Sequence, residues 1–377
     1  MTDVSPLFTP FRLGQLDLPN RFVMPAMQRG MCENGRPKPE LAAYYARRAE
    51  GGVPLIIGES SAVDHPSATA QPNSSWLTAA TADAWARCVD AVRNAGGQML
   101  LQLWHEGAVR NDGHALSPSG RVHPGKANGR AMTLEEMKAI GEGFVRSARI
   151  ARAIGAAGVE VHCAHGYLLD QFLWHGANER DDGYGGPDIA DRVRFPAEIV
   201  SAIRRECGPD FLISLRFSQW KEVDYGARVA ADPAELEGMV TILREAGVDV
   251  LHCSTRRFWE AEWADDGKNL AGWVKALSGL PTITVGSVGL DTDVMTTFIE
   301  GTDPASRIPE AIAELEARLE AGEFDLVAVG RALIGDPDFV TKLASGDPGA
   351  IKTFRRSDLG TLEWDTSVIE EVHRATA

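Results

Sequence analysis

Cysteine is scarce in this sequence, and its spacing excludes several kinds of metal and disulfide protein. The 377 residues include five cysteines, and no two of them are closer than Cys163 and Cys207, which are 44 residues apart (207 − 163 = 44). Iron–sulfur and structural zinc motifs usually place two cysteines only a few residues apart. An odd number of widely spaced cysteines is also untypical of a secreted disulfide framework. We therefore expect reduced thiols, no metal cluster and a cytoplasmic location.

The sequence also lacks long hydrophobic runs and an excess of basic residues. No apolar stretch approaches the roughly 18 residues that a membrane span needs, and residues 1–10 show neither the basic start nor the apolar core of a signal peptide. Lysine and arginine number 38 against 53 aspartate and glutamate residues, so the net charge is −15. Binding to a nucleic-acid backbone needs a basic footprint. We therefore expect no membrane span and no nucleic-acid partner.

What the sequence does contain is an alternation of short apolar runs and amphipathic stretches. Continuous apolar runs are typical of parallel strands that are covered on both faces. Eight such runs predict strands at residues 21–27, 53–60, 98–104, 158–163, 211–218, 248–254, 282–288 and 326–332. Between them, helices are predicted at residues 80–95, 134–155, 195–207, 233–246 and 308–321, the second with Thr133 and Glu136 at capping-box spacing. Eight strands that alternate with helices predict an α/β fold, a (β/α)8 TIM barrel.

A doubly wound open sheet is the competing fold, and one absence weighs against it. Such sheets usually carry a glycine-rich fingerprint after the first strand, and residues 24–31 (MPAMQRGM) have none. No linker rich in proline, glycine or serine divides the chain. We expect one domain over residues 1–377, with a core at about 7–343, a long loop at 107–132 after the third strand, a helical insertion at 303–322 before the eighth, and a C-terminal extension at 344–377.

The predicted strands end in polar residues or glycine, as the strands of barrel enzymes do at the face that carries the active site. The loops after the seventh and eighth strands often bind phosphate in such barrels. Gly286 and Gly330 would let a ligand approach the backbone closely, and Arg331 adds a cation suited to bidentate contacts. The strand ends supply Gln28, Ser60, Gln102, His162, His165, Tyr167, Arg216, Ser254, Ser287 and Arg331.

The fourth strand end carries the densest chemistry and allows three interpretations. His162 and His165 with a nearby cysteine could bind a metal ion such as zinc. Alternatively, the two histidines could donate hydrogen bonds to a substrate oxygen, with Tyr167 as a proton donor. The third interpretation is a pair of buried histidines satisfied within the core.

Several motifs resemble the old yellow enzyme family of FMN-dependent oxidoreductases. They are HCAHGYLLDQFL at residues 162–173 with the following NER at 178–180 and DGYGG at 182–186, LFTPFRLGQLDLPNRFVMPAM at 7–27, LLQLWHEG at 100–107 and DLVAVGRALIGDPDF at 325–339. The resemblance extends from Leu7 to about Leu343. It implies a (β/α)8 barrel with tightly but non-covalently bound FMN, which NADH or NADPH reduces. An α,β-unsaturated carbonyl compound, an enone-type small molecule, would then take hydride at its β-carbon and a proton at its α-carbon in a ping-pong cycle.

The resemblance also implies roles for individual residues. His162 and His165 would hydrogen-bond the substrate carbonyl, and Tyr167 would donate the proton. Toward the flavin, Arg216 would lie near the N1–C2 edge, Gln102 at the pyrimidine edge, and Ser60 with Ala26, Met27 and Gln28 on the N5–O4 side. Gly286, Ser287, Gly330 and Arg331 would hold the phosphate.

Other positions depart from the family pattern or stay open. Gln28 stands where many relatives have threonine or cysteine, and Gly30 where one bacterial branch has a tyrosine that contacts substrate. Trp104 could shape the substrate pocket or pack in the core. Trp220, Trp259 and Trp263 suggest a pocket lined with aromatic residues, and Trp364 could cap the site or simply pack.

Four classes of function remain on the sequence evidence. The first is reduction of activated alkenes. The second is oxidation, demethylation, or reduction of nitro compounds or nitrate esters at the same flavin site. The others are a flavin-binding barrel without catalysis and a zinc-dependent barrel hydrolase that uses His162 and His165. The sequence leaves open the physiological substrate, the choice between NADH and NADPH, and whether the chain forms a homo-oligomer.

Overall fold

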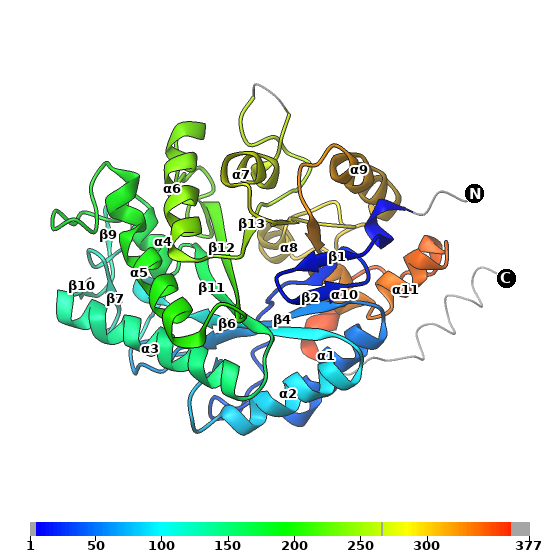
Figure 1. The fold of residues 1–377 in the computed structure, drawn as a ribbon, viewed down its shortest axis with the longest axis horizontal. Helices are drawn as coiled ribbons and strands as arrows, with labels where there is room; N and C mark the ends of the chain where they lie inside the picture. Colours follow the sequence, from blue (N-terminus) through cyan, green and yellow to red (C-terminus); the bar gives the residue numbers. More distant parts are fainter. Residues whose placement is uncertain (1–4, 265–266, 363–377) are drawn as a thin grey trace.

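The computed structural model describes residues 5–264 and 267–362, and its centre is a closed barrel of eight parallel strands (Figure 1). The first barrel strand pairs with both the second and the last, which closes the sheet. The strands follow one another around the barrel in chain order. They are β3 (Phe22–Met24), β4 (Leu55–Ala62), β6 (Gln98–Trp104), β11 (Gly158–His165), β12 (Leu212–Lys221), β13 (Val250–Ser254), β14 (Thr282–Val285) and β15 (Leu326–Ala328). The predicted (β/α)8 barrel is therefore confirmed.

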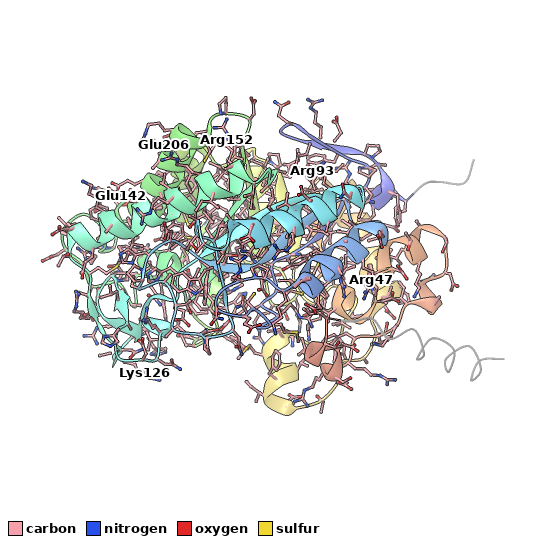
Figure 2. All side chains as sticks on the ribbon, turned by 90° about the horizontal axis from the view of Figure 1, so that it is seen from below. Arg47, Arg93, Lys126, Glu142, Arg152 and Glu206 are labelled. Carbon is pink, nitrogen blue, oxygen red and sulfur yellow. The ribbon has the colours of Figure 1, made fainter. Side chains whose placement is uncertain are left out.

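Helices surround the barrel and pack their apolar faces against it. Charged side chains such as Arg93, Glu142 and Arg152 lie on the outer surface of this layer (Figure 2). The longer helices are α1 (Pro39–Glu50), α2 (Ala82–Asn94), α3 (Leu134–Ala153), α5 (Ile189–Cys207), α6 (Pro233–Ala246), α7 (Leu270–Ser278) and α9 (Ile308–Glu320). Shorter ones are α4 (Leu168–Leu173), α8 (Val294–Glu300), α10 (Arg331–Gly335) and α11 (Phe339–Ala344).

A hairpin at the N-terminal end of the chain packs against the inside of the barrel. Strands β1 (Phe11–Leu13) and β2 (Leu16–Leu18) pair antiparallel around a tight turn, in which Gly14 takes a φ of 58° that favours glycine. Leu13 and Leu18 join a buried cluster with side chains from near the start of the barrel strands, such as Leu55 and Leu212. The hairpin therefore covers the end of the barrel opposite the polar strand ends.

Local sequence signals explain where several helices begin. Thr133 Oγ1 accepts the N–H of Glu136 at 3.2 Å, and Glu136 Oε2 accepts the N–H of Thr133 at 2.9 Å, so the predicted capping box is present at the start of α3. Helix α6 has the predicted bounds, since Asp232 caps its first turn and Gly247 ends it in the left-handed conformation.

Several predicted boundaries differ from the structure. Helix α5 begins at Ile189 rather than at residue 195, because Asp188 caps that earlier turn and Pro196 lies inside the helix. Because proline is typical of a first helical turn, Pro196 favours a predicted start that is later than the real one. The last barrel strand ends at Ala328, four residues early, because Gly330 precedes α10. Strand β12 runs on to Lys221, three residues beyond its predicted end.

The predicted loop and insertion are both present. Residues 107–132 form only small pieces, namely η2 (Gly107–Val109), β7 (Leu116–Ser117), β8 (Arg121–His123), β9 (Lys126–Ala127) and β10 (Arg130–Ala131). The predicted helical insertion contains α9, and α8 precedes it. The remaining elements are η1 (Pro6–Phe8), β5 (Ser75–Trp76), η3 (Pro348–Ala350) and η4 (Arg356–Gly360). Among the helices in the described part of the chain, none has the length and apolar character needed to cross a bilayer.

Candidate active site

A cavity of about 340 Å³ lies at the carboxyl ends of the barrel strands. This volume falls within the range of roughly 300–1,000 Å³ that is typical of small-molecule sites. Every predicted site residue lines this cavity: Ala26, Met27, Gln28, Ser60, Gln102, His162, His165, Tyr167, Arg216, Gly286, Ser287, Gly330 and Arg331. The structure therefore brings together residues that are separated by up to about 300 positions in the sequence.

The two histidines and the tyrosine form one corner of the cavity. The ring centroid of His162 lies 5.2 Å from that of His165 and 5.3 Å from that of Tyr167. Trp104 packs edge-on against Tyr167 at 5.3 Å, and Trp220 packs against His165 at 4.8 Å. Aromatic packing on both sides therefore restrains the orientation of the three side chains.

Hydrogen bonds also hold His165. Its backbone N–H donates to Ser218 Oγ at 3.0 Å, and its ring Nε2 lies 2.8 Å from Ser254 Oγ. His162 Nδ1 is buried and has no hydrogen-bond partner among the described residues. The phenol of Tyr167 likewise makes no hydrogen bond to a described residue. These groups remain available to a ligand in the cavity.

The protonation states of this corner follow from its burial. Burial, and secondarily the charge of Arg216, lowers the pKa of His162 to about 3. Burial likewise lowers the pKa of His165 well below its ordinary value, and it raises the pKa of the Tyr167 phenol. At neutral pH both imidazoles are therefore uncharged with one N–H each, and the phenol keeps its proton.

A second wall of the cavity consists of Ser60, Gln102 and Arg216. Ser60 Oγ donates to Gln102 Oε1 at 2.5 Å. Arg216, which is 8% exposed, donates to the carbonyl oxygen of Ala26 at 3.3 Å and to Ser254 Oγ at 3.2 Å. Its Nε is buried and has no partner among the described residues. This wall presents a fixed cation beside an amide and a hydroxyl group.

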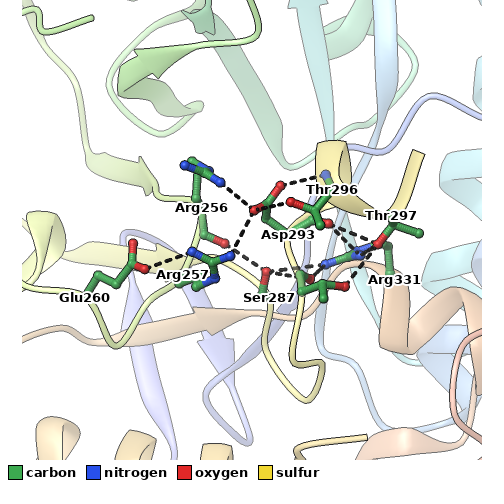
Figure 3. Close-up of polar contacts among 9 residues, drawn as sticks. Arg256, Arg257, Glu260, Ser287, Asp293, Thr296, Thr297 and Arg331 are labelled. Carbon is green, nitrogen blue, oxygen red and sulfur yellow. Dashed lines mark hydrogen bonds and ion pairs between the residues drawn. The ribbon is translucent and has the colours of Figure 1, made fainter. Parts of the chain in front are cut away.

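Arg331 anchors the far end of the cavity (Figure 3). Its guanidinium donates to Thr297 Oγ1 at 2.7 Å, to Ser287 Oγ at 3.3 Å and to the carbonyl oxygen of Thr292. Beside it, the Asp293 carboxylate accepts from Arg256 at 2.7 Å and from Arg257 at 3.3 Å. Two arginines pair with one buried carboxylate here and Arg331 lies beside them, so this end of the cavity is locally positive in an acidic protein.

Two glycines leave room that a side chain would fill. A Cβ atom at Gly286 would lie 2.5 Å from Thr255 Oγ1, which is too close for any real contact. A Cβ atom at Gly330 would contact Met27 and Pro25, which line the cavity. Gly286 therefore makes room for the loop that carries Thr255, and Gly330 keeps the backbone open to the cavity beside Arg331.

Some cavity residues were not predicted from the sequence. Glu222 and Tyr225 follow β12, and Arg256 and Asp293 follow β13 and β14. Glu222 is an exposed residue, but the protein atoms around its carboxyl group at the cavity partly desolvate it, which raises its pKa to about 7. The Ser254-Thr255-Arg256 run directly after a strand was the available signal for Arg256. Phe354 and Leu359, from the predicted C-terminal extension, also line the cavity, and no sequence signal marks them.

The remaining aromatic and loop predictions have mixed outcomes. Trp220 lines the cavity, whereas Trp259 packs on Phe258 and Trp263 packs on Trp273 away from it. Gln28 donates to Ser74 Oγ at 2.9 Å. Neither Gly30 nor any residue of 107–132 lines the cavity. Trp364 lies outside the described residues.

The metal interpretation of His162 and His165 lacks further ligands. Within residues 5–264 and 267–362, no three His, Cys, Asp or Glu side chains converge as a metal ion would require. Cys163, between the two histidines, is fully buried in the core between the barrel and the helices.

The residues of the cavity fit FMN. The partnerless buried Nε of Arg216 and the amide of Gln102 suit the polar edge of an isoalloxazine ring, and apolar side chains such as Ala26 and Met27 suit its face. The arginines around Ser287 and the two glycines suit a phosphate group. The distribution of apolar and cationic groups along the cavity therefore matches the two ends of this cofactor.

Comparison with known sequences points to one family. The sequence profile of the NADH:flavin oxidoreductase / NADH oxidase family matches residues 6–304. The chain is 32% identical to the NADH oxidase of Thermoanaerobacter brockii, over 96% of this chain and 54% of that protein. It is 30% identical to 12-oxophytodienoate reductase 2 of Arabidopsis thaliana, over 94% of this chain and 92% of that protein. The chain thus spans about half the length of the NADH oxidase and most of the plant reductase.

Comparison with solved structures agrees. Morphinone reductase in complex with tetrahydroNAD superposes with a TM-score of 0.76 at 26% identity, over 94% of this chain and 93% of that one. The old yellow enzyme homologue from Zymomonas mobilis gives a TM-score of 0.76 at 23% identity, which supports the fold alone. By its profile match and by its full-length similarity to these reductases, the chain belongs to the NADH:flavin oxidoreductase / NADH oxidase family, the old yellow enzyme family.

Proposed function

We propose that this protein is an FMN-dependent oxidoreductase that reduces the carbon–carbon double bond of an α,β-unsaturated carbonyl compound at the expense of NADH or NADPH. The observation that carries the proposal is the corner of the cavity where His162, His165 and Tyr167 meet. Family membership supports the flavin and the nicotinamide donor. FMN, when bound, supplies hydride transfer from the nicotinamide to the β-carbon of the substrate.

In this proposal, His162 and His165 hold the substrate carbonyl. Addition of hydride at the β-carbon builds negative charge on the carbonyl oxygen, and donors aimed at that oxygen stabilise the transition state more than the ground state. Both imidazoles are uncharged at neutral pH because burial lowers the pKa of each. Each therefore offers one N–H without placing a buried positive charge in the cavity.

Tyr167 is the proposed proton donor to the α-carbon. Its phenol stays protonated at neutral pH because burial raises its pKa, and its O–H makes no hydrogen bond to any described residue. It packs between His162 and Trp104, so its ring is held beside the proposed carbonyl site. General acid catalysis by a positioned side chain contributes about 10²–10⁴-fold in rate.

Arg216, Gln102 and Ser60 are the proposed partners of the flavin ring. A permanent cation near the edge of the ring that becomes negative on reduction favours the reduced cofactor. Ala26, Met27 and Gln28 would contact the side of the ring toward its N5 atom. The residues proposed for the phosphate are Gly286, Ser287, Gly330 and Arg331, to which the structure adds Arg256 as a neighbouring cation.

The experiment that tests the function separates the two half-reactions. Purified protein that carries FMN is reduced anaerobically with NADH and, separately, with NADPH, and the loss of flavin absorbance is followed. Addition of 2-cyclohexenone should then restore the absorbance of the oxidised flavin. Because one site would serve both half-reactions, steady-state rates should follow ping-pong kinetics.

Other outcomes would assign the protein differently. Reoxidation by oxygen, a nitro compound or a nitrate ester, but by no activated alkene, would place the protein among the other flavin enzymes of this barrel. A flavin that neither nucleotide reduces would indicate a binding protein without this activity. Protein that is purified without flavin but with zinc would overturn the proposal as a whole.

A further inference from the structure

A buried carboxylate lies inside the barrel directly next to the residues proposed for the flavin. Glu160 stands on β11 and is fully buried. In the sheet register it lies opposite Gln102 on β6 and Ser214 on β12. Its carboxylate accepts hydrogen bonds from Gln102 Nε2 at 2.8 Å, Ser214 Oγ at 2.9 Å and His252 Nδ1 at 2.7 Å. Glu160 therefore links four neighbouring barrel strands below the cavity.

The contact between Glu160 and Gln102 decides which way the amide of Gln102 faces. An ionised carboxylate only accepts hydrogen bonds, so the amide must turn its nitrogen, not its oxygen, toward Glu160. Ser60 Oγ donates to the amide oxygen at 2.5 Å. A side-chain amide has two N–H donors and two acceptor lone pairs. One donor and one lone pair of Gln102 therefore remain for a ligand in the cavity, in an orientation that Glu160 and Ser60 set together.

Glu160 also supplies a negative charge near Arg216. Side chains two residues apart on a strand share a face, so Arg216 faces the barrel interior as Ser214 does. It lies two residues farther along β12, opposite His162. The charged and titratable groups around Glu160 are Arg216 on β12, His252 on β13 and His162 on its own strand. Burial lowers the pKa of His252, which is then neutral and donates its Nδ1–H. Although burial opposes ionisation of Glu160, its contacts with His252, Arg216 and Gln102 keep its pKa below the ordinary value.

We propose that Glu160 is a positioning residue of the flavin site, which orients the Gln102 amide toward the flavin and partly offsets the charge of Arg216. The inference rests on the proposed FMN binding. Orientation of Gln102 should strengthen binding of both oxidised and reduced FMN. The negative charge of Glu160 should, in contrast, weaken binding of the reduced, anionic cofactor relative to the oxidised one. These two roles can be separated by experiment.

Glu160→Gln removes the charge while it keeps the shape of the side chain. We expect the affinity ratio of reduced to oxidised FMN to rise about tenfold, which corresponds to a positive shift of about 30 mV in the two-electron midpoint potential. Glu160→Asp is the matched control, since it keeps the charge but shortens the reach to Gln102. Its potential should stay near that of the unchanged protein, while the dissociation constant of FMN from the apoprotein, followed by flavin fluorescence, should rise several-fold.

A double substitution tests whether Glu160 acts through Gln102. Once Gln102→Ala is present, Glu160→Asp should weaken FMN binding no further. If Glu160→Gln leaves the potential unchanged and Glu160→Asp leaves FMN affinity unchanged, the inference is overturned while the proposed function stands. If Glu160→Gln does not fold, Glu160→Asp with an unchanged FMN affinity is sufficient to overturn the positioning role. Protein that binds no FMN at all overturns both proposals.

Discussion

His165 combines a strained backbone with a place in the proposed catalytic corner. Its φ is 64°, a left-handed value that costs a residue with a Cβ atom about 1–3 kcal/mol. Gly166 follows with a φ of 87°, so the chain turns sharply at the end of β11. The hydrogen bond to Ser218 and the contact with Ser254 hold this conformation. The turn directs His165 back toward His162, which a regular strand would not do.

The proposed role of Tyr167 as proton donor can be tested by a single substitution. Tyr167→Phe should slow reduction of 2-cyclohexenone by about 10²-fold or more, because it removes the proposed proton donor. Reduction of the flavin by NADH should stay within a factor of two or so of the original rate, since that half-reaction needs no such proton. Stopped-flow absorbance measures the two rates separately. Tyr184→Phe is the control, because the Tyr184 hydroxyl bonds Glu198 away from the cavity. Equal slowing of both half-reactions would contradict the assigned role.

A second prediction concerns His162. Its substitution by alanine removes one proposed donor to a ligand oxygen and should weaken binding of a phenol such as p-nitrophenol roughly tenfold, the upper end for a neutral hydrogen bond. Titration of the flavin absorbance with the phenol measures this affinity. His123→Ala, which changes a histidine in the loop at 107–132, should leave it unchanged. An unaltered affinity in His162→Ala would count against its contact with the ligand.

Site residues could be predicted well where they lie on a strand, and less well where they lie in the turn after a strand. Gln102 and Arg216 lie within apolar strands, so their direction follows from the alternation of the strand. Glu222 and Arg256 lie in turns after β12 and β13, where the direction of a side chain depends on turn geometry that the sequence pattern does not specify. Glu160 lies two residues before His162 on the same strand, and its hydrogen bonds to three other strands depend on tertiary contacts that the sequence pattern does not specify.

Among the elements, β12 and α4 are joined by a buried ion pair. Lys221 Nζ lies 2.6 Å from Asp170 Oδ1, and both side chains are fully buried. Asp170 Oδ2 also accepts the N–H of Gly166 at 2.7 Å. The pair therefore fixes the segment that carries His165 and Tyr167 against the neighbouring strand.

Loss of one partner of this pair should destabilise the protein strongly. Lys221→Met leaves the Asp170 carboxyl buried without its cation and should lower the free energy of unfolding by about 3–5 kcal/mol. Chemical denaturation measures the change. Lys221→Met combined with Asp170→Asn should cost less than the sum of the two single substitutions, because the second removes the unpaired charge. Additive costs in this cycle would show that the pair is not coupled.

The existence and order of the elements could be predicted better than their bounds. Apolar runs of strand length and capping residues such as Thr133 are local signals, and they give the eight barrel strands in their order and the start of α3 correctly. The end of β12 was missed because Gln219 and Lys221 interrupt the apolar run. Lys221 stays in the strand because it pairs with Asp170, a contact between residues 51 positions apart.

Across the whole molecule, segments from both ends of the chain close the cavity. Arg29 donates to the backbone carbonyl oxygens of Asp358, Leu359 and Thr361, at 2.8 Å for Thr361. Phe354 and Leu359 line the cavity as a result. The core was predicted to end near residue 343, where the resemblance to the family ends. The position of residues 344–362 depends on long-range contacts with Arg29, which no local pattern reveals.

Buried histidines should make the stability of the whole protein depend on pH. Burial lowers the pKa of His105 to about 3, and both of its ring nitrogens are hydrogen-bonded in the neutral form. Between about pH 3 and the ordinary value near 6.5 the unfolded state binds a proton that the native state does not, so the free energy of unfolding falls as the pH is lowered through this range. Each such histidine contributes up to about 1.4 kcal/mol per pH unit.

Substitution isolates the contribution of one histidine from that of other groups. Asp170 acts in the opposite direction, because burial raises its pKa to about 6 and the native state then holds a proton that the unfolded state releases. His105→Gln should therefore reduce the slope of unfolding free energy against pH by up to about 1.4 kcal/mol per unit between pH 6 and pH 4, relative to the unchanged protein. Denaturant titrations at several pH values measure the slope. Identical slopes would contradict a neutral buried His105.

The central claim is that the cavity couples oxidation of a reduced nicotinamide to reduction of an activated alkene. The most direct test is anaerobic turnover of the FMN-bound protein with NADH or NADPH and 2-cyclohexenone, with both nucleotide consumption and cyclohexanone formation measured. The account predicts one cyclohexanone for each nucleotide oxidised. Nucleotide oxidation without cyclohexanone, in protein that carries its full complement of FMN, would contradict it.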